Sequence, residues 1–238
     1  MIELTYDLHI HSCLSPCSND DMTPQNIVAM SSLKDLDVIA ITDHNSCKNC
    51  PALMNIAKEY NIVAIPGMEL TTLEEVHVLC LFYTLDSALA FDNYVYDRIL
   101  PIQNNANIFG HQILWDKSDK SVGEISKLLI SSTDISIDNL WEILREFNGI
   151  MIPAHIDKTS TSIISNLGFI PPDSKFSCVE LMDENNLHNL RQLNPYLNKC
   201  SVLYSSDAHT LGDISEPKQT ISVSERSIQA VLDKLVMT

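Results

Sequence analysis

The sequence predicts an α/β fold in which seven strand–helix units close into a barrel, and three observations support this. Short runs of β-forming residues alternate with helical patterns along most of the 238-residue chain, which is typical of a mostly parallel sheet. Residues able to carry chemistry stand at the ends of several strands, as they do at the carboxyl-terminal rim of a barrel. With 45% hydrophobic and 19% charged residues, the chain can bury the core that this fold needs.

Seven short runs rich in β-forming residues are the predicted strands. The first alternates apolar and polar residues, so every second side chain faces the same side of the strand. In chain order the runs are Leu4–Ile10, Val38–Ile41, Ile62–Ile65, Val76–Phe82, Ile150–Pro153, Cys178–Leu181 and Ser201–Tyr204.

Helical patterns separate most of these strands. The first helix should begin at Thr23-Pro24, because threonine is a good N-cap and proline suits the first turn, and should end near Leu33. In Asp138–Phe147 apolar residues recur at core spacing, and Gly149 lies just beyond the end. The other predicted helices are Pro51–Tyr60, Leu187–Leu197 and Ser224–Val236.

Residues 87–136 do not follow this alternation and contain almost no candidate ligands. We predict a helix over Ala88–Leu100, a polar loop over Gln103–Asn107 and a further helix around Val122–Leu129. The segment is interpreted as a mostly helical insertion in a single domain that spans residues 1–238. We expect it to pack over or beside the mouth of the barrel.

The charge and hydropathy of the chain limit its partners. A formal net charge of −16 repels nucleic-acid backbones, so long nucleic acid is an unlikely partner. A small anionic substrate is compatible with this charge if bound metal reverses the local sign. No apolar run is long enough to span a membrane, and the N-terminus enters a strand-like segment without a secretory signal, so we expect a cytoplasmic protein.

Seven cysteines in a chain without a sign of export do not predict a disulfide framework. Cys13 with Cys17, and Cys47 with Cys50, are spaced like half-sites for thiolate-bound zinc or an iron–sulfur cluster. Buried, reduced and inert thiols are the favoured interpretation of both pairs. The remaining cysteines lie in or beside apolar runs and are expected in the core: Cys80, Cys178 and Cys200.

Metal-binding residue types gather at the ends of the predicted strands. His9 and His11 are two residues apart on one strand, so their rings emerge on the same face about 6–7 Å apart and can bind one ion. Six of the eight histidines belong to this set, and His111 and His188 are expected at the surface or in packing roles. The full set is His9, His11, His44, Glu69, His77, His155, Asp207 and His209.

Imidazole and carboxylate ligands without cysteine suit zinc, manganese or iron. Eight ligands are too many for one ion, so we expect two or three divalent metal ions that share a bridging carboxylate, with Glu69 as the bridge. Asp43 and Asp157 are better placed to orient a ligand ring than to bind metal directly.

These motifs resemble those of the PHP (polymerase and histidinol phosphatase) family of metal-dependent phosphoesterases. The resemblance implies a distorted barrel of seven βα units with a metal cluster, usually of three ions, at its carboxyl-terminal rim. The residues that carry it are Asp7-Leu8-His9-Ile10-His11, Ile41-Thr42-Asp43-His44, Pro66-Gly67-Met68-Glu69, His77, Pro153-Ala154-His155 and Ser206-Asp207-Ala208-His209.

The resemblance also implies how the ligands are divided between the ions. The first ion would be held by His9, His11, Glu69 and Asp207, the second by Glu69, His77 and His155, and the third by His44 and His209. The family usually supplies an aspartate to the third site just ahead of a Thr-Pro, and Asn19 stands there in this chain. Either Asp20 or Asp21 replaces it, or the third ion binds weakly.

The implied activity is that of a phosphatase or phosphodiesterase, in which a hydroxide that bridges metal ions attacks a phosphate mono- or diester. The expected substrate is a small phosphorylated molecule: a nucleotide, an oligonucleotide end or a metabolite. His209 and His44 are candidates to protonate the leaving oxygen. Lys158 is the first candidate to bind the phosphate, ahead of Lys48 and Arg191.

Two other functions stay open at this point. A nuclease acting on polymeric DNA or RNA would use the same chemistry, but the acidic balance of the chain argues against it. A non-catalytic, metal-binding domain is the second alternative, and the near-complete ligand set argues against it.

Overall fold

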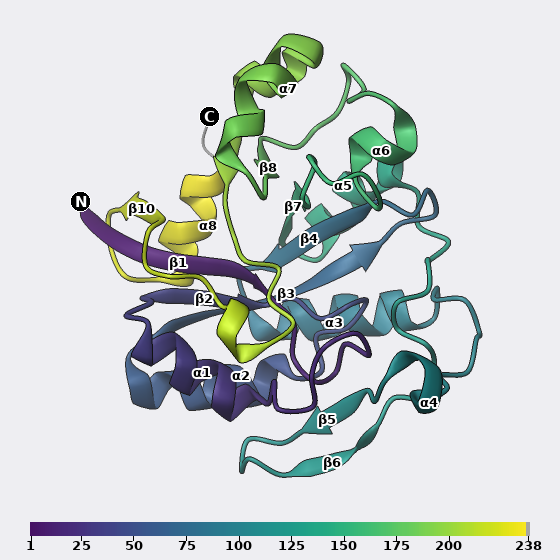
Figure 1. Ribbon diagram of the computed structural model, residues 1–238, viewed down its shortest axis with the longest axis vertical. Coiled ribbons are helices and arrows are strands. Elements are labelled where there is room, and N and C mark those ends of the chain that lie inside the picture. The colour runs from purple at the N-terminus through teal and green to yellow at the C-terminus, as the bar shows by residue number, and fades with distance from the viewer. Residues whose placement is uncertain (237–238) are drawn as a thin grey trace.

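The computed structural model describes residues 1–236 and shows a mixed α/β fold built on one curled, six-stranded sheet (Figure 1). A separate parallel pair, β8 (Cys178–Glu180) and β9 (Ser201–Leu203), lies beside it. The order of strands in the large sheet is β10-β1-β2-β3-β4-β7. Their bounds are β1 Ile2–Ile10, β2 Val38–Ile41, β3 Val63–Thr71, β4 His77–Phe82, β7 Gly149–Pro153 and β10 Thr220–Val223.

The predicted barrel of seven βα units with mostly parallel strands is not confirmed as such. Strands β1, β2 and β3 are parallel, but β4 runs antiparallel to both β3 and β7, and β10 runs antiparallel to β1. The reason lies in the connection between β3 and β4. It is a tight turn in which the Thr72 amide donates to the carbonyl oxygen of Val76, with Glu75 at φ 59°, so no helix crosses back over the sheet. Strand β10 was not predicted.

A few backbone hydrogen bonds join the pieces of the sheet at one end. The Ile156 amide, just after β7, donates to the carbonyl oxygen of Glu180 in β8 over 2.9 Å. The His11 amide, just after β1, donates to the carbonyl oxygen of Ala208 over 2.9 Å. The segments that follow β1, β2, β7 and β9 therefore meet on one rim, together with the end of β3.

Most helices cover the outside of this sheet (Figure 1), whereas the helix nearest the C-terminus packs against the apolar cluster on the other face. Thr23 caps α1 as predicted, with its side chain accepting from the Asn26 amide and Pro24 in the first turn. The predicted helix over 187–197 is interrupted, because a helix seldom continues into the residue before a proline, and Pro195 begins a separate 3₁₀ turn. Helix α6 was not predicted. The helices are α1 Pro24–Leu33, α2 Cys50–Ala57, α3 Leu85–Tyr96, α4 Ala106–Phe109, α5 Ile137–Glu146, α6 Ile163–Leu167, α7 Leu187–Leu193 and α8 Ile228–Val236. Within residues 1–236, no helix combines the length and apolarity needed to cross a membrane.

The expectation of a mostly helical insertion was wrong in its second half. The predicted helix around Val122–Leu129 is instead the second strand of a hairpin, β5 (Ile113–Trp115) with β6 (Ser121–Glu124), seen at the lower edge of Figure 1. A β-branched valine beside Gly123, whose φ is +138°, disfavours a helix here. The hairpin is connected to the main fold, since the Ile113 amide donates to the carbonyl oxygen of Cys13.

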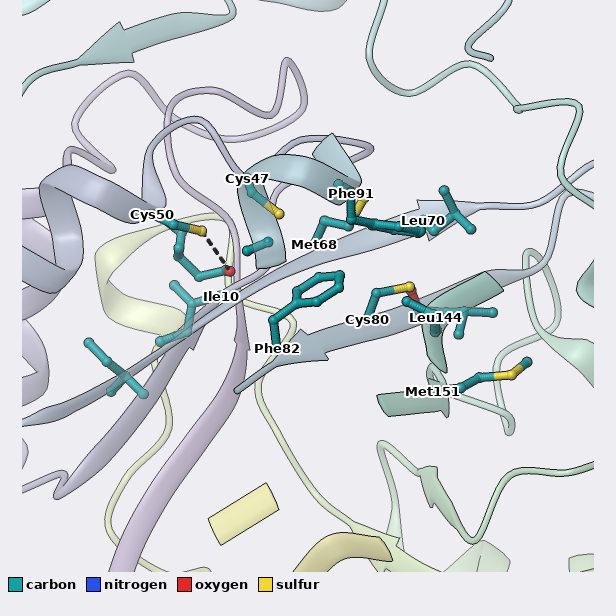
Figure 2. Packing of buried hydrophobic residues seen from close by; sticks show 14 of the residues in the cluster. Ile10, Cys47, Cys50, Met68, Leu70, Cys80, Phe82, Phe91, Leu144 and Met151 are labelled. Carbon is teal, nitrogen blue, oxygen red and sulfur yellow. Dashed lines mark hydrogen bonds between the residues drawn. The ribbon is translucent and has the colours of Figure 1, made fainter. Parts of the chain in front are cut away.

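Both faces of the large sheet are buried, and the side chains of β4 show the alternation. Val78, Cys80 and Phe82 belong to the larger apolar cluster, which the helices cover (Figure 2). Leu79 and Leu81 point the other way, into a second cluster enclosed by the curl of the sheet. The rim that carries the metal-binding residues is thus held on a packed core.

Candidate metal centre

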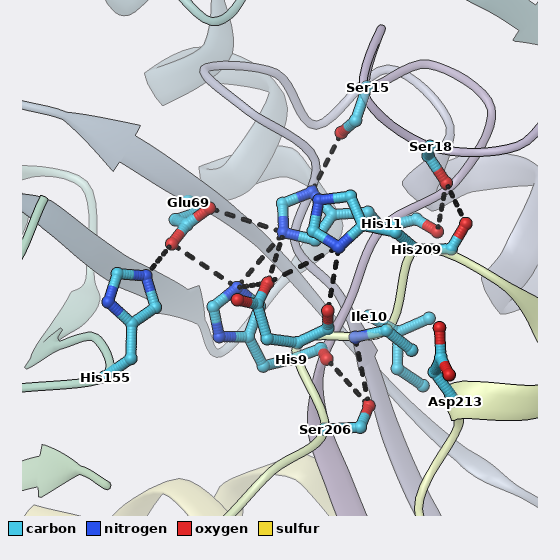
Figure 3. Close-up of polar contacts among 12 residues, drawn as sticks. His9, Ile10, His11, Ser15, Ser18, Glu69, His155, Ser206, His209 and Asp213 are labelled. Carbon is cyan, nitrogen blue, oxygen red and sulfur yellow. Dashed lines mark hydrogen bonds and ion pairs between the residues drawn. The ribbon is translucent and has the colours of Figure 1, made fainter. Parts of the chain in front are cut away.

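All eight predicted ligands converge on one rim of the sheet, although they come from six separate parts of the chain. Figure 3 shows five of these ligands: His9, His11, Glu69, His155 and His209. Within residues 1–236, three groups have ligand atoms that all lie within 4.8 Å of one another. The first group is His9, His11, Glu69 and Asp207; the second is His44, Glu69 and His77; the third is His11, His44 and His209. Only His155 lies outside these groups, and it contacts Glu69.

The first group is the most completely formed. The Nε2 atoms of His9 and His11 lie 3.1 Å apart, and each is 3.2 Å from Oδ1 of Asp207. Glu69 closes the group with its two oxygens 3.4 Å and 3.3 Å from the same two nitrogens. All four side chains are almost completely removed from solvent.

The opposite nitrogens of the two rings are held elsewhere, which fixes where their protons lie. Nδ1 of His9 lies 2.9 Å from Oε2 of the buried Glu180, so it donates its proton to that carboxylate. Nδ1 of His11 lies 2.9 Å from Oγ of Ser15, and this hydroxyl donates in turn to Asp43 over 2.8 Å. When the rings are neutral, each therefore directs the lone pair of its Nε2 at the other ring and at two carboxylates.

These acceptor atoms repel one another unless a cation lies among them. The shifted pKa values of the four side chains reflect this repulsion. Burial lowers the pKa of His9 and His11, but the surrounding carboxylates outweigh burial, raising that of His9 well above its usual value and that of His11 to about 9. Burial alone would raise the pKa of Glu69 and Asp207, but the neighbouring imidazoles hold the pKa of both below its usual range. The donor set thus fits a divalent metal ion.

Glu69 also connects the first group to His77 and His155. Its Oε1 lies 2.9 Å from Nδ1 of His77 and 3.0 Å from Nε2 of His155. The β3–β4 register explains the first contact: Thr71 pairs with His77, so Glu69 and His77 are diagonal neighbours on one face of the sheet. The Glu69 carboxylate thus faces the first group and also His77 and His155, as a bridging ligand must.

The third group is less complete. Its three members are imidazoles, and Nε2 of His11 already faces the first group. Burial, together with the neighbouring His11, lowers the pKa of His44 and of His209, so both rings are neutral near pH 7 and suited to bind metal. Asn19 is exposed and reaches the site only through its amide, which donates to the carbonyl oxygen of His209. Neither Asp20 nor Asp21 is in any group found within residues 1–236.

Of the predicted basic residues, only Lys158 contacts the centre. Its ammonium group forms a close ion pair with Oδ2 of Asp207, while its side chain remains 39% exposed. Lys48 instead pairs with the buried Asp92 over 2.7 Å. Arg191 lies on α7 and contributes to none of the three groups.

The residues expected to orient the ligands have different roles. Asp43 acts on His11 through Ser15 rather than on the neighbouring His44. Asp157 does not orient His155, because its carboxylate accepts from the amides of Met182 and Asp183 over 2.9 and 3.0 Å.

Sequence reasoning missed Glu180, which orients His9 and also accepts from the His155 amide. Its signal is a single carboxylate in an apolar strand, since a buried charge needs a partner.

Asn45 was also missed and ties the centre to the inserted segment. Its side-chain amide donates to the carbonyl oxygens of Leu129 and Ser131, and its oxygen accepts from the Thr71 amide. Asn45, His155 and Asp207 all have positive φ values, of 49°, 31° and 53°. Such strained backbone is kept where the surrounding contacts determine it, and it clusters here around the ligands.

The cysteines do not take part in the groups found in the described part of the chain. The thiols of Cys47 and Cys50 are buried and both donate to the carbonyl oxygen of Gly67. Cys13 is buried and Cys17 is exposed, and all seven cysteines are free. His111 and His188 lie at the surface, where they contact Glu124 and Gln192.

Comparison with known proteins gives one family. The sequence matches the PHP domain over residues 7–156. An uncharacterized protein of Methanocaldococcus jannaschii, MJ1587, is 32% identical over 78 residues, which cover 29% of this chain and 44% of that protein.

Solved structures share the fold at low sequence identity. A lesion-specific endonuclease of Pyrococcus furiosus, PfuEndoQ, is 18% identical with a TM-score of 0.70, covering 98% of this chain and 56% of that one. Endonuclease Q in complex with a 27-mer duplex bearing an abasic lesion superposes with a TM-score of 0.61 at 18% identity, over 97% and 55% of the two chains. A putative metal-dependent phosphoesterase of Bifidobacterium adolescentis is 15% identical with a TM-score of 0.55, over 97% and 95%. The chain thus spans about half the length of MJ1587 and of the endonuclease.

Proposed function

The chain belongs to the PHP domain family, and we propose that it hydrolyses phosphate mono- or diesters of small molecules at a cluster of divalent metal ions. One observation carries the proposal: the Nε2 atoms of His9 and His11 face each other and two carboxylates, while their Nδ1 atoms are occupied by Glu180 and Ser15. With both rings neutral, this arrangement gathers electron-pair donors at one buried spot, where a divalent cation would be stabilised.

The first ion would be held by the first group, and the second by Glu69, His77 and His155. The third would be held by His44 and His209, with lower affinity because the aspartate usual in the family is replaced by Asn19. The lack of thiolate ligands favours zinc, manganese or iron. Such ions supply an activated water and neutralise charge on a phosphoryl group.

The remaining residues of the centre bind and orient. Within residues 1–236, Lys158 is the one Lys or Arg side chain paired with a predicted ligand, and we assign it to the phosphate oxygens. Proton donation to the leaving oxygen is the second role proposed for His209, whose side chain is 30% exposed, whereas that of His44 is 7% exposed. The lowered pKa of both rings makes metal binding the better-supported role.

Cleavage of DNA is a second candidate function. The likeness to a lesion-specific endonuclease extends over 98% of this chain, and that enzyme has been seen on duplex DNA. The earlier expectation that long nucleic acid is an unlikely partner is therefore weakened. The net charge of −16 still opposes it, and the chain spans only 56% of the endonuclease.

The test uses purified protein loaded with manganese, zinc or iron after chelation. The substrates are p-nitrophenyl phosphate, bis(p-nitrophenyl) phosphate and a duplex oligonucleotide with an abasic site. The His9→Ala/His11→Ala double variant should lose bound metal and lower kcat/KM by about a thousandfold or more. His111→Ala, a surface histidine, is the matched control. Normal turnover in the double variant would refute the proposal, and cleavage of the duplex alone would favour the second candidate.

A further inference from the structure

A cavity of about 470 Å³ adjoins the metal centre on the side of α6 and α7. Lys158 is part of both: its side chain lines the cavity, and its ammonium group contacts Oδ2 of Asp207. Lys158 therefore connects the cavity to the metal centre. The volume falls within the range of pockets that bind small molecules.

The lining of this cavity is apolar at its floor and polar but uncharged at its rim. Ile156 is buried, and Ile164 and Leu190 are partly buried. Exposed hydroxyl and amide side chains form the rim: Thr159, Ser165, Asn186 and Asn189.

The two charged residues of the lining are already paired. Asp157 accepts from the Met182 amide through one oxygen and from the Asp183 amide and the Asn186 side chain through the other. Lys158 is paired with Asp207. A ligand in the cavity would thus meet hydrogen-bonding groups of both kinds and no free charge.

The wall next to the metal centre is held in place before any ligand arrives. The Lys158 amide donates to the carbonyl oxygen of His155, and the Ser162 hydroxyl donates to the carbonyl oxygen of Lys158, each over 2.9 Å. The contacts of Asp157 fix the same loop to the segment after β8. A pre-formed wall loses little entropy on binding, which favours selective recognition.

We propose that this cavity binds the uncharged, hydrogen-bonding part of the substrate, a sugar or a nucleobase, while the phosphate lies at the metal centre. The inference rests on the proposed function and deepens it, because it assigns substrate selectivity to the loop 156–159, α6 and α7. Binding energy from this distant group would orient the ester at the metal centre.

The experiment compares three diesters that share a p-nitrophenol leaving group. They carry a methyl group, an abasic 2-deoxyribose or thymidine on the other side of the phosphate. Wild-type protein should prefer the larger esters over the methyl ester. Thr159→Trp, which fills the cavity from an exposed position, should reduce this preference by about tenfold or more. Ser160→Trp is the matched control, since Ser160 is exposed and does not line the cavity.

Each outcome bears on the proposal. Loss of preference at the abasic ester identifies the sugar as the ligand, and loss only at thymidine identifies the base. An equal effect of Thr159→Trp on all three esters, or no preference in the wild type, overturns the inference. If no ester is hydrolysed, the proposed function fails. Calorimetric binding of thymidine 5′-phosphate then tests the cavity assignment separately. Affinity that Thr159→Trp leaves unchanged overturns this assignment, whereas affinity lost in Thr159→Trp but kept in Ser160→Trp upholds it.

Discussion

Raising the pH from 7 to 8 should destabilise the metal-free protein and stabilise the metal-loaded one. Without metal, the carboxylates around His11 outweigh burial and raise its pKa to about 9, against about 6.5 in the unfolded chain. The folded state therefore holds this proton more tightly. The resulting stability is fully present below pH 6.5 and is lost as the pH rises through 9.

The magnitude follows from the two pKa values of His11. Between pH 7 and 8 the folded ring stays mostly protonated while the unfolded ring is mostly neutral, so the free energy of unfolding falls by about 1 kcal/mol. His9, whose pKa is also raised, adds to the fall. His44 and His209 have lowered pKa values and the opposite sign, but they act mainly below pH 7. Buried thiols such as Cys178, with a pKa raised to about 12, act mainly above pH 8.

The assay is urea unfolding at several pH values between 7 and 8, with a chelator or with saturating zinc. Metal needs the deprotonated Nε2 atoms, so its stabilising effect grows as the pH rises. The two series should have slopes of opposite sign. His11→Gln should flatten the metal-free slope, and the surface variant His111→Gln should leave it unchanged. Metal-free stability that is constant or rises between pH 7 and 8 would refute this reasoning.

Three further predictions concern residues around the ligands. Glu180→Gln should weaken metal binding by about 10- to 100-fold, because an uncharged amide oxygen is a weaker acceptor for the Nδ1 proton of His9. Competition with a chromogenic chelator measures this, and unchanged affinity would count against the role of Glu180. Asn45→Ala should lower the free energy of unfolding by about 1–3 kcal/mol, since it leaves buried backbone groups unpaired, and a loss within the error of urea titrations would contradict it. Lys158→Met should tighten metal binding, because it removes the cation that competes for Asp207, and it should raise KM for a phosphate ester. Weaker metal binding in this variant would show that Lys158 instead supports Asp207 as a ligand.

The strand ends that carry ligands could be predicted because their signals are local. The alternation in β1 places His9 and His11 on one face, and apolar runs mark β2 and β7. The direction of β4 could have been inferred as well, since the predicted strands Ile62–Ile65 and Val76–Phe82 leave ten residues between them, fewer than a helical crossover needs.

The inserted hairpin gave no such signal, because contacts distant in sequence hold it. The buried side chain of Gln112 donates to the carbonyl oxygens of Ile125 and Lys127 and accepts from the Leu129 amide. A hairpin with a partly buried strand of three residues and an exposed strand of four has little stability of its own. A pattern of residue types cannot show that one glutamine pairs a segment lying more than ten residues away.

The charges of the first group explain why the residues that contact its ligands, Glu180 and Lys158, are as necessary as the ligands themselves. Glu69, Asp207 and Glu180 bring three carboxylates into a site that is almost sealed from water. They face the imidazoles of His9 and His11, and Glu69 also contacts those of His44, His77 and His155. Lys158 adds a positive charge in the metal-free protein by pairing with Asp207. A divalent metal ion bound here would displace the protons of the imidazoles and neutralise Asp207. Lys158 would then be released from Asp207 and could bind an incoming phosphate, so metal binding would prepare the side chain that holds the substrate.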